Sequence, residues 1–240
     1  MKDPLIKFKK SMKGLTAKDE RVTCFSSSPL QIMLLSPQAE RNWEDLCSVL
    51  EDVLEEQAHR QLFAVELGSG TGQHVIRFAQ KMPFVTWQPS DIKEESRDSI
   101  KAYIAATHAK TVLQPVHLDA SEPWEKWAGL SRSSCDIVIA INLLQYSSFK
   151  TGVFNGAGQI LRQNGLLITY GVSAKSSFKF IIHVKYHHSL FTDVSICDRN
   201  PDWGLPDIDV LRQLAYGNGM RMERIIEMEE YYKCLIFRKL

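Results

Sequence analysis

The spacing of apolar residues along the chain switches repeatedly between short continuous runs and a helical period. Continuous runs, typical of buried strands, lie at 63–67, 84–88, 113–118, 136–141, 166–170, 222–228 and 233–238. A helical period appears at 39–53, 73–82, 100–104, 153–161 and 208–215. Because strands and helices alternate, we predict one α/β domain with a mostly parallel sheet of seven strands and helices on both faces. No helical pattern separates the last two strands, which predicts one antiparallel strand.

Residues 1–32 lack this pattern and are rich in lysine, with a serine run before Pro29. We therefore expect a flexible basic extension ahead of a domain at 33–240. A mitochondrial transit peptide is the weaker alternative, because arginine is scarce and acidic residues are present. Within the domain, Asn164 and Gly165 predict the end of the helix before the fifth strand, and Pro115 makes the third strand imperfect because proline has no backbone N–H.

The most informative segment joins the first strand to the helix at 73–82 and contains Gly68, Gly70 and Gly72. Glycine at every second position predicts a tight turn whose backbone can approach a ligand closely. A strand, a glycine turn and a helix form the opening of a Rossmann-like nucleotide-binding unit. A dinucleotide fingerprint would place its third glycine at the position of Gln73, so the spacing disfavours a dinucleotide oxidoreductase. A glycine-rich turn that binds no ligand is the alternative interpretation.

This segment resembles motif I of the class I S-adenosylmethionine-dependent methyltransferases, in which an acid precedes the glycines. The resemblance implies a single class I methyltransferase domain. It also implies that Glu66 acts near the methionine ammonium group of S-adenosylmethionine. The cofactor-binding residues that it implies in this segment are Glu66, Gly68, Ser69, Gly70 and Gly72.

Ligands of open α/β sheets bind at the carboxyl ends of the strands, so the polar residues there are further candidates. Asp91 lies nineteen positions after Gly72, an offset at which a carboxylate accepts hydrogen bonds from both ribose hydroxyls. Asp119 follows the third strand, and the resemblance implies that it accepts from the adenine amino group. Asn142 ends the fourth strand, where methyl donor and acceptor meet in this fold. The alternatives are a helix N-cap for Asp91 and a turn residue for Asp119.

Six blocks of sequence give a closer resemblance, to the methyltransferase-like 26 family of uncharacterised proteins. They lie in order at 36–42, 68–74, 87–91, 168–171, 199–204 and 234–238. The first block places Arg41 and Asn42 on the helix before the first strand. The resemblance implies that Arg41 pairs with the cofactor carboxylate and that Asn42 bonds the cofactor or the substrate. A solvated helix start is the alternative.

The chain departs from that family where an acceptor substrate is expected. Gln145 stands at the position of a family histidine after the fourth strand, and Val172 replaces a family proline. Tyr231 and Tyr232 replace a pair of asparagines, and the segment 172–198, within an acceptor-side insertion at 172–205, matches the family poorly. The cofactor half of the sequence is therefore intact, whereas the acceptor half has changed.

We expect a small-molecule acceptor beside Asn142, Gln145 and Tyr146, the candidate catalytic residues. Two leucines after Asn142 replace the prolines of the Asn-Pro-Pro-Tyr motif of amide and nucleobase N-methyltransferases. Methyl transfer from a sulfonium is an in-line displacement, in which the protein mainly aligns the reactants and excludes water. A base is needed only if the acceptor must lose a proton early, and Gln145 cannot take one. Other candidate bases are Tyr146, His183, His187, His188, Asp193 and Tyr231.

Composition narrows the partners and the compartment. The 240 residues include 29 Lys and Arg against 28 Asp and Glu, a balance without the electrostatic footprint of nucleic-acid binding. No apolar run is long enough to span a bilayer. Five widely spaced cysteines favour a reducing compartment, so we expect a cytoplasmic protein. His183, His187 and Asp193 could share a metal, but their helical context is uncertain and we expect no metal site.

These observations favour an enzyme that transfers a methyl group from S-adenosylmethionine to a small molecule. The changed acceptor side leaves a second hypothesis from another functional class. In that hypothesis the chain is a non-catalytic interaction protein that is derived from a methyltransferase and still binds the cofactor.

Overall fold

The computed structural model describes residues 21–24, 31–145, 147–173, 206–229 and 232–240 of the chain. The chain divides into two compact units. The first unit combines Met1–Gln61 with Ser69–His117, and the second combines Leu62–Gly68 with Leu118–Leu240. The chain therefore passes from one unit to the other inside the predicted strand–turn–helix segment.

The first unit contains three helices and strand β4. Helix α2 (Pro37–Leu54) begins after Ser36, whose hydroxyl accepts a hydrogen bond from Ala39 N, and is followed by the short helix η1 (Glu55–Gln57). Helix α3 (Gln73–Lys81), strand β4 (Val85–Pro89) and helix α4 (Glu94–Thr107) come next. Their apolar faces meet in a core that includes Phe78 and Trp87, with ring centroids 5.4 Å apart. The helix and strand predictions for these segments are confirmed.

The third predicted strand, 113–118, differs from a regular strand. It forms only isolated parallel bridges, Trp87 with Val112 and Ser90 with Val116. Val116 N donates to Pro89 O at 3.1 Å, but Pro115 has no N–H to continue the ladder. The segment therefore follows β4 in the predicted parallel direction without becoming a strand.

Two short strands lie ahead of α2, and one of them falls within the predicted flexible extension. β1 (Arg21–Cys24) pairs antiparallel with β2 (Gln31–Leu34). Leu34 N donates to Ser99 Oγ at 2.8 Å, and Leu34 O accepts from the Tyr103 hydroxyl at 3.0 Å. The main chain of β2 is thus fixed to α4.

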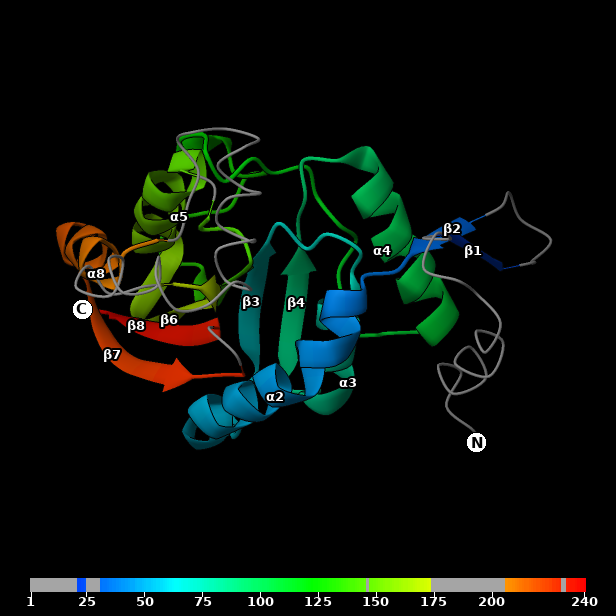
Figure 1. Cartoon of the computed structure of the whole chain (residues 1–240), viewed down its shortest axis with the longest axis horizontal. Helices are drawn as coiled ribbons and strands as arrows, with labels where there is room; N and C mark the ends of the chain where they lie inside the picture. Colours follow the sequence, from blue (N-terminus) through cyan, green and yellow to red (C-terminus); the bar gives the residue numbers. More distant parts are fainter. Residues whose placement is uncertain (1–20, 25–30, 146, 174–205, 230–231) are drawn as a thin grey trace, which may run out of the picture. The chain divides into compact units, whose positions relative to one another are not determined.

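The second unit is built on strands in the order β3-β5-β6-β8-β7. β3 (Leu62–Leu67), β5 (Cys135–Ile141) and β6 (Leu161–Val172) are parallel, and β8 (Tyr232–Lys239) is antiparallel to both β6 and β7 (Met220–Glu227). Figure 1 shows β7 and β8 beside each other in orange and red. The predicted mostly parallel sheet with one antiparallel strand is confirmed, although the described residues contribute only five strands here and β4 in the first unit.

Helices α5 (Ser147–Ile160) and α8 (Ile208–Gly217) and the short helix η2 (Trp124–Lys126) pack on this sheet. Phe154 of α5 meets Phe237 of β8 edge to face, with ring centroids 5.0 Å apart. α5 ends at Ile160, earlier than Asn164 and Gly165 predicted, because Leu161 already pairs with Cys135 of β5. The chain as a whole has the predicted α/β, Rossmann-like fold.

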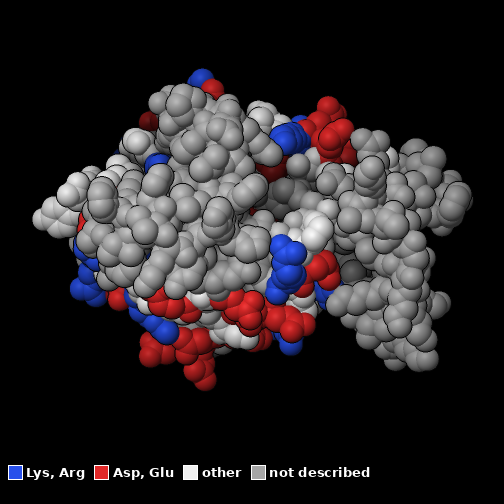
Figure 2. All heavy atoms as spheres, viewed as in Figure 1, with Lys and Arg blue, Asp and Glu red and all other residues white. Residues whose placement is uncertain are grey.

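The described surface carries charges of both signs (Figure 2), with acidic atoms gathered along the lower edge of the view. Helices α2 and η1 contain seven acids and only one base. These are Glu40, Glu44, Asp45, Glu51, Asp52, Glu55 and Glu56, against Arg41. No described helix is both long and apolar enough to cross a membrane.

Candidate functional site

The glycine turn Ser69–Gly72 lies in the first unit. Ser69 N donates to Ser90 O at 2.8 Å, and Ser90 N donates to Ser69 Oγ at 3.1 Å, which ties the turn to the end of β4. Gly70 N donates to Asp91 Oδ2 at 2.9 Å. Two predicted cofactor segments, the glycine turn and Asp91, are therefore in direct contact.

Gly70 and Gly72 have different roles in this turn, although both adopt left-handed backbone angles, with φ of 54° and 89°. A β-carbon added at Gly72 would lie 2.8 Å from the Ile100 side chain, so glycine is needed there for α4 to pack against the turn. A β-carbon added at Gly70 would meet no atom within 4 Å. Gly70 thus faces open space into which a ligand can fit.

Asp91 is half-buried and held from two sides. Its Oδ2 accepts from Gly70 N, and its Oδ1 accepts from Lys93 N at 2.9 Å. The N-cap of α4 is Lys93, so Asp91 lies outside the helix and does not cap it. An ionised carboxylate offers about four acceptor positions, and the two backbone bonds leave positions for two further hydroxyl donors.

Gln73 and His74 each make polar contacts with the start of α2, which the sequence analysis did not single out. Gln73 Oε1 accepts from Ser36 N at 2.5 Å and from Thr71 Oγ1 at 2.9 Å, and Gln73 Nε2 donates to Glu40 Oε1 at 2.8 Å. The start of α2 is thereby fixed to the glycine turn. The available signal was a pair of polar residues at a buried helix start, because both side chains are buried in α3.

His74 is the buried titratable group of this network. Its Nε2 lies 2.8 Å from Asn42 Oδ1, and with that oxygen as acceptor Nε2 carries the hydrogen. Burial lowers the pKa of His74 from 6.5 to about 4. His74 is therefore neutral at physiological pH and orients the carboxamide of Asn42, whereas the neighbouring Arg41 is exposed on α2.

In the second unit, Glu66 and Gly68 lie at the carboxyl end of β3. Glu66 is only 1% exposed on β3. Gly68 has a left-handed φ of 64°, and a β-carbon there would lie 3.2 Å from the Leu143 side chain. Asp119 Oδ1 accepts from Ser121 N at 2.8 Å and from Ser121 Oγ at 2.6 Å, so one carboxylate oxygen stabilises the local turn. The turn interpretation of Asp119 and a ligand role are compatible, because its other oxygen is not part of these bonds.

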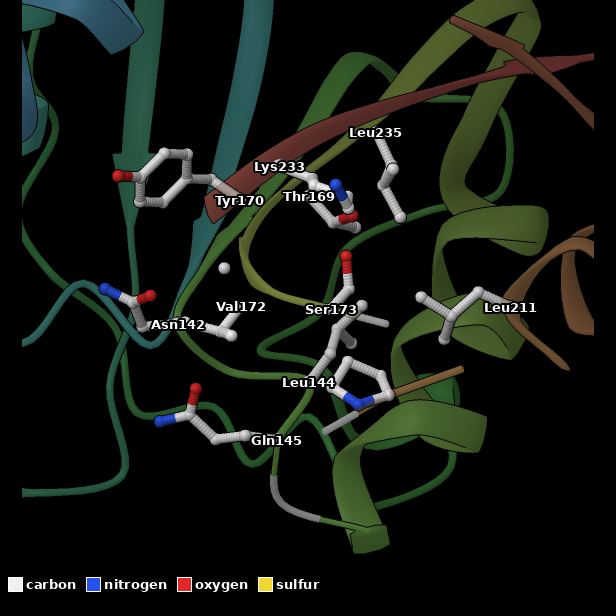
Figure 3. Close-up of a pocket in the computed structure, with 12 residues that line it drawn as sticks. Asn142, Leu144, Gln145, Thr169, Tyr170, Val172, Ser173, Leu211, Lys233 and Leu235 are labelled. Carbon is white, nitrogen blue, oxygen red and sulfur yellow. The ribbon is translucent and has the colours of Figure 1, made fainter. Parts of the chain in front are cut away.

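A pocket lies at the carboxyl ends of β5 and β6 (Figure 3) and encloses about 270 Å³, part of it open to solvent. Two predicted acceptor-side residues, Asn142 and Gln145, line it, whereas Tyr146 lies outside the described residues. Also outside the described residues are the other candidate bases, His183, His187, His188, Asp193 and Tyr231, together with the rest of 174–205. The other lining residues are Leu144, Thr169, Tyr170, Gly171, Val172, Ser173, Pro206, Leu211, Lys233 and Leu235.

Asn142 has an unusual backbone conformation at the mouth of β5. Its φ of 53° is in the left-handed region, which asparagine tolerates better than most residues. Asn142 N donates to Tyr170 O at 2.7 Å, which fixes it to β6. A β-carbon at Gly171 would lie 3.6 Å from Asn142 Oδ1, an ordinary contact distance, so this carboxamide lies beside Gly171. Such local departures concentrate at functional sites.

The sequence analysis did not single out the polar lining residues Thr169, Tyr170 and Lys233, whereas Ser173 falls within the predicted acceptor-side insertion. Strand register supplies the signal that was available, because Gly171 pairs with Lys233 and Thr169 with Leu235. Directly opposed residues share a face of the sheet, so these side chains face one pocket. Among the residues that the structure describes, no group of three or more histidine, cysteine or acidic side chains could hold a metal ion.

Comparison with solved structures relates the fold to known proteins. A putative sarcosine dimethylglycine methyltransferase from Galdieria sulphuraria has a TM-score of 0.65 at 15% identity, covering 92% of this chain and 93% of its own. A SAM-dependent methyltransferase from Aquifex aeolicus has a TM-score of 0.59 at 11% identity, covering 85% and 94%. An O-methyltransferase family protein from Burkholderia thailandensis has a TM-score of 0.62 at 14% identity over 83% of this chain. The match spans 60% of the Burkholderia protein's length.

These likenesses establish the fold. The family model described as "Protein of unknown function (DUF938)" matches residues 33–239, nearly the whole predicted domain. With a class I methyltransferase fold and a match of this length, the chain belongs to the DUF938 family.

Proposed function

We propose that the protein binds S-adenosylmethionine and transfers its methyl group to a small-molecule acceptor. The observation that carries the proposal is the hydrogen bond between Gly70 N and Asp91 Oδ2, beside the open space at Gly70. A glycine turn provides close backbone approach, and a held carboxylate provides acceptors for vicinal hydroxyls. The likeness to methyltransferase structures supports the same conclusion.

Each predicted cofactor residue has a proposed role within its own unit. In the first unit, Asp91 accepts from the ribose hydroxyls, the Ser69–Gly72 turn lies against the ligand, and the Arg41 and Asn42 segment of α2 is held nearby by His74. In the second unit, Glu66 and Gly68 serve the methionine part, and Asp119 accepts from the adenine amino group. The cofactor supplies a methyl group already activated on a sulfonium.

The protein's own part in the reaction is alignment and exclusion of water. Asn142 and Gln145 line the pocket and can orient an acceptor through their carboxamides. The aliphatic lining residues exclude water from the same pocket. The Galdieria neighbour is a putative sarcosine dimethylglycine methyltransferase, and this likeness supports a small acceptor.

One observation favours a second candidate, a cofactor-binding protein without catalysis. Gln145 lines the pocket at the position where the methyltransferase-like 26 family has histidine, and a carboxamide cannot take a proton at neutral pH. We also propose that the chain belongs to the methyltransferase-like 26 family and that the protein is cytoplasmic.

Calorimetric titration of the full chain with S-adenosylmethionine, and separately with NADH, tests the cofactor. We expect binding of S-adenosylmethionine alone, and a loss of roughly tenfold to a hundredfold in affinity for Asp91→Ala, because two charge-assisted hydrogen bonds disappear. Asp98→Ala is the matched control: Asp98 is an exposed acid on α4 that pairs with Lys101 at 2.9 Å. Its affinity should equal that of the wild type.

The outcomes separate the candidates. Binding of NADH alone, or equal loss in both variants, contradicts the cofactor assignment. If S-adenosylmethionine binds, release of S-adenosylhomocysteine during incubation with a small-metabolite extract distinguishes an enzyme from a non-catalytic binding protein.

A further inference from the structure

Lys233 occupies a defined place in the pocket of the second unit. In the β7–β8–β6 ladder it lies between Glu227 on one side and Gly171 on the other. The next row of the same face contains Ile225, Leu235 and Thr169. Because Gly171 has no side chain, nothing on β6 directly opposes the Lys233 side chain; its ammonium group pairs with Glu227 of β7, and the residue lines the pocket.

The charge balance around Lys233 is asymmetric. Its side chain is only 16% exposed, whereas the paired Glu227 carboxylate is 69% exposed on edge strand β7. A solvated carboxylate is a weak counter-ion, because water screens it and its side chain retains freedom. The ammonium group of Lys233 is thus a mostly buried cation whose partner a ligand can replace.

The rest of the lining complements an anion. None of the twelve lining residues is acidic, and Lys233 is the only cation among them. Ser173 is 8% exposed, and its Oγ has no hydrogen-bond partner among the described residues. Figure 3 shows this hydroxyl directed to the side of the pocket where Thr169 and Lys233 lie. A donor hydroxyl and an ammonium group on one wall suit a carboxylate.

Part of the lining is aliphatic. Leu144, Leu211 and Leu235 are buried; in Figure 3 Leu144 lies on the far side of Ser173 from Lys233, whereas Leu235 lies near Thr169 and Lys233. Burial of a short hydrocarbon chain against these side chains is favourable, because it removes apolar surface from water. A cationic amine gains nothing comparable, because it would lie beside Lys233 without an acidic lining partner.

We propose that the acceptor pocket recognises a small aliphatic carboxylate, with Lys233 as its charge-recognising residue and Ser173 as a second donor. The inference rests on the proposed function, since it assigns the substrate class of the same site. It specifies recognition of the acceptor by its carboxylate group and short hydrocarbon part.

Ligand-observed NMR titration with butyrate tests this recognition, with butyramide as the neutral isostere and butylamine as the cationic analogue. We expect butyrate to bind the full chain at least about tenfold more tightly than either analogue. Lys233→Met should remove this preference, and Lys233→Arg should retain it. Glu227→Gln is the matched control, because it removes the partner of Lys233 but keeps the cation, and its butyrate affinity should equal or exceed that of the wild type.

Equal binding of butyrate and butyramide overturns the proposal. So does a Glu227→Gln variant as weak as Lys233→Met, because the ion pair would then act only on the structure. Circular dichroism of each variant identifies loss of folding, and the Arg and Gln variants keep the test valid if the Met variant does not fold. Calorimetry with S-adenosylmethionine on the same preparations separates the two proposals: cofactor binding without butyrate preference refutes only this inference.

Discussion

Acidification between pH 7.5 and 5 should destabilise the first unit through His74. The imidazole is 9% exposed, its Nε2 bonds to the neutral carboxamide of Asn42, and burial lowers its pKa to about 4. Below pH 6.5 the unfolded chain takes up a proton at this position, whereas the folded chain does not until near pH 4. Since the unfolded state binds more protons in that window, the free energy of unfolding falls as the pH falls.

The size of the effect follows from the two pKa values. At pH 5 the difference contributes a loss of about 2 kcal/mol, and below pH 4 it levels off at about 3 kcal/mol. Both figures are a large part of a typical stability of roughly 5–15 kcal/mol. Above the unfolded-state pKa of 6.5, this contribution to the free energy of unfolding is present in full.

Urea unfolding, followed by tryptophan fluorescence at pH 7.5 and pH 5, measures this loss. His74→Gln keeps a donor for Asn42 but does not titrate, so it should lose about 2 kcal/mol less than the wild type between the two pH values. His59→Gln is the control, because His59 is an exposed histidine after η1. If the wild type and His74→Gln lose equal stability, His74 is not a buried neutral group and the reasoning is wrong.

Two further predictions concern glycines. Gly72→Ala should lower the free energy of unfolding by about 2 kcal/mol or more, because the left-handed backbone is strained and the new methyl group meets Ile100. Gly70→Ala should lower the free energy of unfolding only by the backbone strain, about 1 kcal/mol, and should weaken S-adenosylmethionine binding in calorimetry. Similar losses of stability in Gly70→Ala and Gly72→Ala would contradict the different roles of the two glycines. Gly156→Ala should lower the thermal unfolding midpoint by several degrees, because its methyl group would lie 2.0 Å from the buried Trp127 ring, and an unchanged midpoint refutes the close packing.

The spacing of apolar residues predicted the strands and helices correctly wherever a strand or helix buries a continuous face. The runs at 63–67 and 136–141 became β3 and β5, because strands of a parallel sheet are apolar on both faces. It failed at 113–118, where the missing N–H of Pro115 outweighs the apolar pattern. The local signal at Asn164 and Gly165 also placed the end of α5 too late, because the pairing of Leu161 with β5 ends the helix earlier.

Part of the candidate site could also be predicted from the sequence. Glycine spacing and strand-end acids are local signals, so Gly70 and Asp91 could be named in advance, and the structure places them in contact. Lys233 could not be named, because it reaches the pocket only through the pairing of β8 with β6, about sixty residues earlier in the chain. Gln73 likewise acquires its importance from Ser36 and Glu40, which the sequence separates from it.

Left-handed backbone angles occur at predicted site residues in both units. In the first unit, Gly70 adopts one that no packing contact requires. In the second unit, Asn142 adopts one despite its side chain, and its backbone N–H is fixed to Tyr170 O of β6. Strained conformations of non-glycine residues persist only where the surroundings hold them in place, and they cluster at ligand and active sites. Gly72, by contrast, is explained fully by packing against Ile100, so among the predicted site residues it is Gly70 and Asn142 whose conformations packing does not explain.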